Sequence, residues 1–218
     1  MNCPLCDARA KLFWTGENRE YELCGQCGLI FVPPSFHLNK KSEIERYQEH
    51  ENRLDNKGYV AMFMNKIILV KNHCPKIKTA LDFGCGFEPV LQTLLNNEGI
   101  ETEIYDPNFF PVFPSDKTFD LVISTETFEH FRNPRADIKI ALNSISPSGV
   151  LAVMTRFYPL KQNKPCKKSF SEWYYQRDPT HIAFYTSKTF KWISKNFALS
   201  ILLDNEFDFV LFKKSLAK

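Results

Sequence analysis

One short stretch, LDFGCGFEP at positions 81–89, constrains the fold more than any other part of the chain. A short apolar run leads directly into two glycines, Gly84 and Gly86. A buried strand that passes through a glycine turn into a helix is typical of open α/β sheets that bind nucleotide-like ligands. A loop that binds pyrophosphate would carry a third glycine, but Glu88 and Pro89 stand where it would fall. The stretch therefore predicts a strand, a turn and a helix at a ligand site, and makes a dinucleotide the weaker choice of ligand.

Strand and helix patterns alternate along the rest of the chain. Short apolar runs are typical of buried strands, and longer amphipathic runs are typical of helices. The expected strands are 79–83, 101–106, 119–124 and 150–155, the expected helices are 89–97, 133–145 and 187–196, and a closing antiparallel pair is expected at 199–204 and 207–214. This order predicts an α/β fold with a mostly parallel sheet and helices on both faces. Ligands of such sheets bind beyond the carboxyl ends of the strands, so the loops that follow the strands are the candidate site.

An acidic residue, Asp106, ends the second expected strand about 20 residues after the glycine turn. A carboxylate in this position can accept hydrogen bonds from the hydroxyl groups of a ribose. Each feature also has a simpler explanation. The glycines could form an ordinary tight turn, and Asp106 could begin an Asp-Pro turn with Pro107. Two glycines after one strand, followed by an acidic residue at the end of the next strand, favour a ligand site over those alternatives.

Four of the seven cysteines form two pairs near the N-terminus. Cys3 with Cys6, and Cys24 with Cys27, have the C-x2-C spacing, and seventeen residues separate the two pairs. Four thiolates at this spacing are typical of a structural zinc site, because they complete a tetrahedral shell and leave no position for water. Free cysteines in a surface loop are the alternative. An odd and sparse set of cysteines also argues against a disulfide framework and for a reducing compartment.

These patterns divide the chain into three parts. Residues 1–34 are expected to form a zinc ribbon, residues 35–77 a helical bridge, and residues 78–218 the main α/β domain. The bridge begins with a charged, helix-favouring segment at 42–54. Tyr47, in this segment, is a candidate to fold over a ligand bound by the main domain.

Charge and hydropathy limit the kinds of partner that the chain is expected to bind. The 218 residues include 28 basic and 25 acidic side chains, and a formal net charge of +3 gives little reason to expect nucleic acid. No stretch approaches the roughly 20 apolar residues that span a bilayer, and no apolar signal segment begins the chain. We therefore expect a cytoplasmic protein without a membrane partner. The sequence leaves its oligomeric state open.

Four stretches resemble the successive motifs of one enzyme family. They are ALDFGCG at 80–86, IYDPN at 104–108, FDLVISTETFEHFRNP at 119–134 and RDPTHIAFYTSKTF at 177–190. Together they are similar to class I S-adenosylmethionine-dependent methyltransferases, and the cysteine pairs resemble the subgroup with an N-terminal four-cysteine zinc ribbon. The resemblance implies a Rossmann-like, seven-stranded, mostly parallel sheet whose last strand is inserted antiparallel. It also implies a cofactor bound over the first two strands and a substrate that enters above the later loops.

The resemblance also assigns cofactor-binding residues by their positions. They are Asp82, Gly84, Cys85 and Gly86 for the methionine part of S-adenosylmethionine, Asp106 for its ribose, and Thr125 and Glu126 in the loop after the third strand. S-adenosylmethionine has no pyrophosphate, so the missing phosphate-binding glycine is compatible with it. Members of the family usually carry glycine where Glu88 stands in this chain.

His181 is the candidate catalytic base. Imidazole titrates near neutral pH, and this histidine lies in the loop after the fourth expected strand, on the expected substrate side. The alternative is a histidine that only ties this loop down by hydrogen bonds.

We interpret the chain as an enzyme that transfers a methyl group to an oxygen or carbon of a small metabolite. One alternative is an RNA methyltransferase of the type that modifies ribosomal RNA, although the only basic cluster is KQNKPCKK at 161–168. Another is a cofactor-binding pseudo-enzyme or interaction module.

Overall fold

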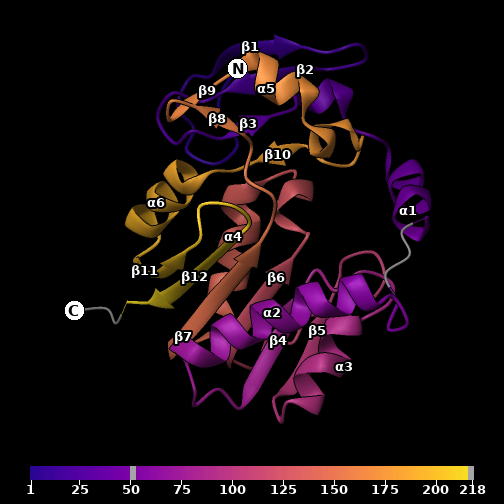
Figure 1. Ribbon diagram of the computed structural model, residues 1–218, viewed down its shortest axis with the longest axis vertical. Coiled ribbons are helices and arrows are strands. Elements are labelled where there is room, and N and C mark those ends of the chain that lie inside the picture. The colour runs from indigo at the N-terminus through magenta and orange to yellow at the C-terminus, as the bar shows by residue number, and fades with distance from the viewer. Residues whose placement is uncertain (50–52, 216–218) are drawn as a thin grey trace.

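The central element of the computed structural model, which describes residues 1–49 and 53–215, is a six-stranded sheet. Its strands are β4 Thr79–Phe83, β5 Glu101–Tyr105, β6 Phe119–Thr125, β7 Ile145–Met154, β11 Leu199–Asp204 and β12 Phe209–Lys214. The order across the sheet is β11-β12-β7-β6-β4-β5 (Figure 1). The strands β5, β4, β6 and β7 pair in parallel, and β12 runs antiparallel between β7 and β11. The predicted α/β fold with a mostly parallel sheet is confirmed.

The seven strands implied by the family resemblance are a wrong prediction for the part of the chain that the structure describes. After β5 the chain passes to β6 through residues 106–118, in which only the isolated bridge between Asp106 and Phe110 is strand-like. This segment contains three prolines, which cannot donate a hydrogen bond to a neighbouring strand. It is also too short for the helical crossover and the strand that a further parallel partner of β5 would need. The strand β5 is therefore an edge of the sheet.

Helices cover both faces of this sheet, as predicted. Their bounds are α2 Lys57–His73, α3 Val90–Asn97, α4 Pro134–Asn143 and α6 Ser187–Asn196. Successive side chains of a strand point to opposite faces, so Leu121 and Ile123 pack with α2 and α3 in one apolar cluster. Val122 packs with α4 and α6 in another cluster. The strand β6 is consequently buried on both sides and positions the loop that follows it.

A second sheet joins the cysteine-rich N-terminus to a distant part of the chain. Its strands are β1 Lys11–Thr15, β2 Glu20–Leu23, β3 Ile30–Phe31 and β10 Ala183–Phe184, in the order β1-β2-β3-β10. The smaller elements near it are the hairpin of β8 Leu160–Lys161 and β9 Lys164–Pro165, the helix α5 Lys167–Glu172 and the 3-10 segments Pro34–Phe36, Phe128–His130 and Tyr174–Arg177. Phe170 of α5 packs edge-on against Phe13 and Tyr21. The N-terminal ribbon thus packs on residues 158–184, and the three-part division of the chain stays a prediction.

The bridge between the two sheets contains α1 Lys40–Gln48 followed by α2. Asn39 and Asn56 cap the N-termini of these two helices, because their side chains accept hydrogen bonds from the backbone N–H groups of Ser42 and Tyr59. The helix expected over 42–54 ends earlier, at Gln48. The part of that prediction at 50–52 lies outside the described residues.

Within residues 1–49 and 53–215, no helix combines the length and the apolar character needed to cross a lipid bilayer.

A buried ion pair fixes α2 to the residue that precedes β12. The Lys66 ammonium lies 2.6 Å from Oδ1 of Asp208, and both side chains are less than one-tenth exposed. Asn205 donates a second hydrogen bond to the same oxygen, and Arg156 lies 3.7 Å from Oδ2. Removing one partner of a buried pair leaves the other charge without compensation, and that loss costs more than the intact pair contributes.

We predict that Asp208→Asn lowers the free energy of unfolding by about 3 kcal/mol, because it leaves the Lys66 ammonium buried without its counterion. Chemical denaturation measures this loss. The double variant Lys66→Met/Asp208→Asn should recover part of it, since no buried charge then remains at the pair. Glu98→Gln, at an exposed pair with Lys71, is the control and should change stability little. Equal, small effects of Asp208→Asn and Glu98→Gln would contradict the prediction.

Candidate functional site

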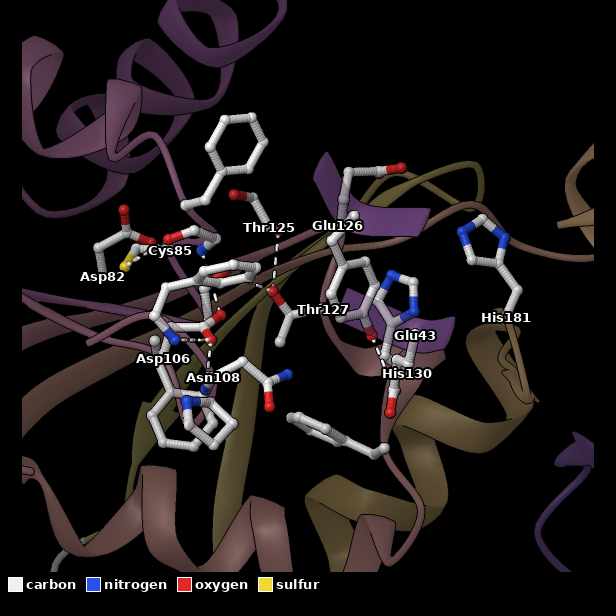
Figure 2. Close-up of a pocket in the computed structure, with 18 of the residues that line it drawn as sticks. Glu43, Asp82, Cys85, Asp106, Asn108, Thr125, Glu126, Thr127, His130 and His181 are labelled. Carbon is white, nitrogen blue, oxygen red and sulfur yellow. Dashed lines mark hydrogen bonds between the residues drawn. The ribbon is translucent and has the colours of Figure 1, made fainter. Parts of the chain in front are cut away.

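A cavity of about 1030 Å³ lies at the carboxyl ends of β4, β5 and β6. Figure 2 shows carboxylates, a threonine pair and two imidazoles around it. Every residue predicted to act at the site lines this cavity: Asp82, Gly84, Cys85, Gly86, Asp106, Thr125, Glu126 and His181. The structure therefore brings together residues from four separate parts of the chain, while the role of each remains a prediction.

The glycine turn after β4 is locked against the loop after β6. Gly84 has a φ of +84°, and a Cβ atom on it would lie 2.2 Å from Cγ2 of Thr127, so only glycine fits. The Thr127 hydroxyl lies 3.0 Å from the carbonyl oxygen of Gly84 and 2.9 Å from that of Thr125. Gly86 also has a positive φ, but a Cβ atom there would meet no atom within 4 Å. Its backbone faces the cavity, and a ligand can approach it closely.

Asp106 ties the end of β5 to this turn. Its Oδ2 accepts a hydrogen bond of 3.2 Å from the N–H of Gly86. Its Oδ1 accepts from the N–H groups of Asn108 and Phe109, at 2.8 and 3.2 Å. A carboxylate has about four lone-pair positions and three of them are occupied here, so Asp106 can accept one further hydrogen bond, on Oδ2, from a hydroxyl group of a ligand.

Asp82 is the residue whose chemistry points most directly to a cation. Its side chain is 1% exposed, and its Oδ1 has no hydrogen-bond partner among the described residues. Burial, followed by the negative charge of Asp106, raises the pKa of Asp82 to about 8. A positively charged group of a ligand would satisfy the free oxygen and stabilise the ionised form. The residues present at this turn therefore fit a ligand with an ammonium and a ribose.

Glu88, which follows the glycine turn, lines the cavity. Its Oε1 is 3.7 Å from Nε of Arg53, and both side chains are at least one-third exposed. An exposed pair at this distance contributes little to stability. Cys85 also lines the cavity, and burial raises the pKa of its thiol.

Two glutamates on the opposite wall share the hydroxyl group of one tyrosine. The Tyr175 hydroxyl lies 3.1 Å from Oε2 of Glu126 and also donates to Oε1 of Glu129. Burial raises the pKa of Glu126 to about 7 and raises that of Glu129 further above its usual range. The sequence analysis did not single out Glu129. Its spacing of three residues from Glu126 was the available signal, because such a spacing can place two side chains on one side of a turn.

His181 lies beside these carboxylates and is 7% exposed. Its Nδ1 is 2.7 Å from the carbonyl oxygen of Tyr175, and its ring centroid is 4.9 Å from that of His130. Burial, followed by the neighbouring His130, lowers the pKa of His181 to about 3. An imidazole with so low a pKa is neutral at pH 7 but has little affinity for a proton. The general-base role remains a prediction. The hydrogen bond to the carbonyl oxygen of Tyr175 supports the alternative, in which His181 only ties its loop down.

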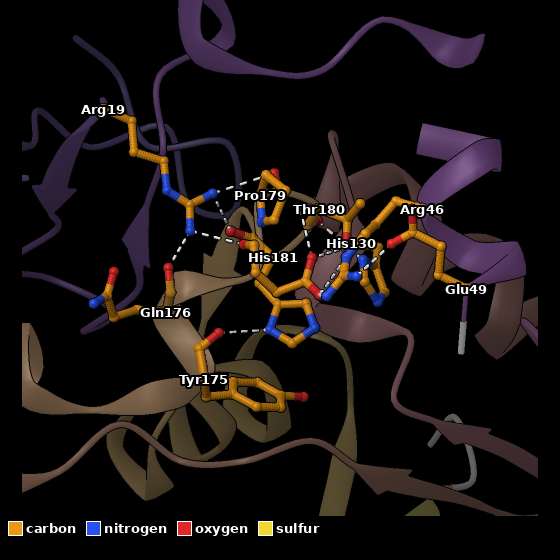
Figure 3. A network of polar contacts seen from close by, with 10 residues as sticks. Arg19, Arg46, Glu49, His130, Tyr175, Gln176, Pro179, Thr180 and His181 are labelled. Carbon is orange, nitrogen blue, oxygen red and sulfur yellow. Dashed lines mark hydrogen bonds and ion pairs between the residues drawn. The ribbon is translucent and has the colours of Figure 1, made fainter. Parts of the chain in front are cut away.

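The N-terminal ribbon holds the loop that carries His181, as Figure 3 shows. The Arg19 guanidinium donates to four carbonyl oxygens: those of Gln176, Asp178 at 2.8 Å, Pro179 at 3.2 Å and His181 at 3.1 Å. From the other side, Arg46 of α1 lies 2.9 Å from Oδ2 of Asp178. Sequence analysis missed Arg19, because nothing in its local sequence indicates these distant partners.

The helix α1 also brings Tyr47 to the cavity, where the sequence analysis placed it as a candidate. Its hydroxyl donates to Oε1 of Glu43 at 3.0 Å, and its ring packs edge-on against His130 with centroids 5.1 Å apart. Tyr47 and the loop at 176–181 therefore line one side of the cavity.

The four N-terminal cysteines form a compact cluster. The Sγ atoms of Cys3 and Cys27 are 3.6 Å apart, those of Cys6 and Cys24 are 3.3 Å apart, and all four lie within 4.8 Å of one another. Sulfurs bound to one tetrahedral zinc ion would be about 3.8 Å apart. The cluster therefore has the donor set and the size of a four-thiolate metal site.

Comparison with solved structures shows the same fold in other proteins. The 1,6-didemethyltoxoflavin-N1-methyltransferase of Burkholderia thailandensis, with bound 1,6-didemethyltoxoflavin and S-adenosylhomocysteine, has a TM-score of 0.57 and 10% sequence identity over 94% of this chain and 100% of that chain. DesVI of Streptomyces venezuelae has a TM-score of 0.50 and 14% identity over 83% of this chain and 100% of that chain. At these identities the likeness concerns the fold alone. No curated protein matches the chain at a significant level.

A family model described as a methyltransferase domain matches residues 50–203, which is more than half of the chain. The matched region contains the glycine turn, Asp106 and the loop that carries His181. The chain therefore belongs to the methyltransferase-domain family.

Proposed function

We propose that this chain is an S-adenosylmethionine-dependent methyltransferase that methylates an oxygen or carbon of a small metabolite. The observation that carries the proposal is the pair of buried carboxylates, Asp82 and Asp106, on either side of a glycine turn that faces a large cavity. One carboxylate oxygen of Asp82 lacks a partner among the described residues, and Asp106 retains one acceptor position on Oδ2. The ammonium and the ribose of S-adenosylmethionine complement these two groups.

The residues of the chain would act mainly by binding and orienting. Asp82 would hold the ammonium, Asp106 would accept a hydrogen bond from the ribose, and the backbone at Gly86 would allow the ligand to lie against the turn. When bound, S-adenosylmethionine supplies an electrophilic methyl group on its sulfonium. Thr125 and Glu126 line the cavity at the end of β6, beyond the glycine turn, and would border the bound cofactor. Alignment of the two reactants is a major source of rate enhancement in such transfers.

A small acceptor is favoured by the shape of the site. A cavity of about 1030 Å³ has room for the cofactor and a metabolite. Tyr47 and the loop at 176–181 line one side of it. The enzyme from B. thailandensis, which shares the fold, holds S-adenosylhomocysteine together with a small molecule.

We also propose that Cys3, Cys6, Cys24 and Cys27 bind a structural zinc ion. The sulfur distances and the burial of three of the thiols support a closed site without a position for substrate. Cys27 adjoins Gly28, whose carbonyl oxygen accepts a hydrogen bond of 2.7 Å from the Tyr158 hydroxyl. Loss of the metal would therefore loosen the ribbon where it packs on the main domain.

The zinc proposal predicts that the purified chain releases one equivalent of zinc when a mercurial reagent blocks its thiols. Cys24→Ser should lack this thiol-linked zinc and should melt at a lower temperature, because metal binding at such a site contributes to folding. Cys74→Ser, outside the cluster, is the matched control and should keep the metal. A wild-type protein with reduced thiols and no thiol-linked zinc would show the proposal to be wrong.

For the cofactor, we predict that Asp106→Ala weakens the binding of S-adenosylhomocysteine by about 1.5–3 kcal/mol, the usual value of hydrogen bonds to a charged group. Calorimetric titration measures the change, and the melting temperature shows whether the loop after β5 is still folded. Asp116→Asn changes an exposed acid of the same loop and should bind like the wild type. Wild-type affinity in Asp106→Ala would exclude Asp106 from the cofactor site.

A further inference from the structure

Glu129, His130 and His181 bring three possible metal-ligand atoms together on one side of the cavity. One ligand atom from each residue lies within 4.8 Å of those of the other two. Glu129 and His181 are buried, and the two histidines line the cavity. Figure 2 shows both imidazoles on the side of the cavity away from Asp82 and Asp106. The cluster therefore lies where a methyl acceptor would approach.

Both imidazoles are oriented by the same kind of hydrogen bond. Nδ1 of His181 is 2.7 Å from the carbonyl oxygen of Tyr175, and Nδ1 of His130 is 3.0 Å from that of Thr180. A carbonyl oxygen can only accept, so each Nδ1 carries a proton and Nε2 of a neutral ring carries the lone pair. Histidines that ligate metal ions usually make this hydrogen bond with their other nitrogen. Two lone-pair donors are thus fixed in neighbouring rings, with centroids 4.9 Å apart.

Glu129 adds an oxygen that the protein leaves unsatisfied. Its side chain is 0% exposed, its Oε1 accepts from the Tyr175 hydroxyl, and its Oε2 has no hydrogen-bond partner within the described residues. A buried carboxylate oxygen without a partner is unfavourable unless a cation lies nearby. A metal ion would satisfy the carboxylate and the lone pairs together.

We propose that Glu129, His130 and His181 bind one divalent transition-metal cation through a carboxylate oxygen and two imidazole nitrogens. Three protein ligands leave coordination positions open, and these face the cavity because both histidines line it. An acceptor with a hydroxyl or carboxylate oxygen would fill an open position. This assignment of an oxygen-bearing acceptor rests on the proposed methyl transfer, whereas the binding of the cation does not.

The donor set separates this site from the cysteine cluster. Imidazole and carboxylate ligands accept Mn²⁺, Fe²⁺, Co²⁺ or Zn²⁺, whereas four thiolates select zinc and bind Mn²⁺ weakly. Mn²⁺ is therefore a probe that reports the second site while zinc stays in the first. Its electron paramagnetic resonance signal distinguishes free from bound ion.

The test is a titration of the full chain, with its thiol-bound metal retained, by Mn²⁺ alone. The wild type should bind one equivalent. His181→Asn and Glu129→Gln should each weaken binding at least tenfold, the loss that even an outer-shell change can cause. His73→Asn, at an exposed histidine at the end of α2, is the matched control and should bind like the wild type. Melting temperatures of all variants separate loss of ligand from loss of fold.

A second measurement needs no variant. In wild-type protein with ¹⁵N-labelled histidine, Mn²⁺ should broaden the imidazole resonances of His130 and His181 before those of His37 and His73. The site is disproved if neither Mn²⁺ nor Co²⁺ binds at one equivalent, if both site variants bind as tightly as the wild type, or if all histidines broaden together. S-adenosylhomocysteine is titrated separately. Loss of that binding with Mn²⁺ binding retained would reject the proposed function and leave the cation site standing.

Discussion

The parallel pairing of β5, β4, β6 and β7 is the constraint on which the rest of the molecule depends. Parallel register places Asp82 beside Ile104 on one neighbour and Ile123 on the other, so the three strands end at the same edge. The glycine turn, Asp106 and the loop at 125–130 then converge because each follows one of these strands. Antiparallel pairing would have sent alternate loops to opposite edges. The contact between Gly84 and Thr127 closes the arrangement by locking two of the loops together.

The N-terminal ribbon is a structural part of the site, although its cysteines lie away from the cavity. Its sheet takes β10 as the fourth strand, and β10 directly follows the loop that carries His181. The Arg19 guanidinium donates hydrogen bonds to four carbonyl oxygens of that loop, and Arg46 of α1 forms an ion pair with Asp178. A metal ion in the ribbon would therefore influence the acceptor side of the cavity through packing and hydrogen bonds. It would have no direct chemical role.

Local patterns were sufficient to predict most of the fold and the residues that line the cavity around the glycine turn. The strand at 79–83 and the helix at 187–196 were predicted to the residue, because apolar periodicity and capping are local properties. The seventh strand was wrong because it came from the family resemblance, and residues 106–118 are too short and too rich in proline to supply it. Arg19 could not be predicted, since its partners lie 157 to 162 positions away. Glu129 shares a turn with Glu126, but only the packing of Tyr175 shows that both carboxylates meet.

The central claim is that the cavity at the ends of β4 and β5 binds S-adenosylmethionine. A crystal structure of the full chain with S-adenosylhomocysteine tests it most directly. The account predicts the ammonium of the ligand within hydrogen-bond distance of Asp82 and a ribose hydroxyl within hydrogen-bond distance of Asp106. S-adenosylhomocysteine bound elsewhere on the protein, or absent from this cavity in crystals grown at a saturating concentration, would contradict the account.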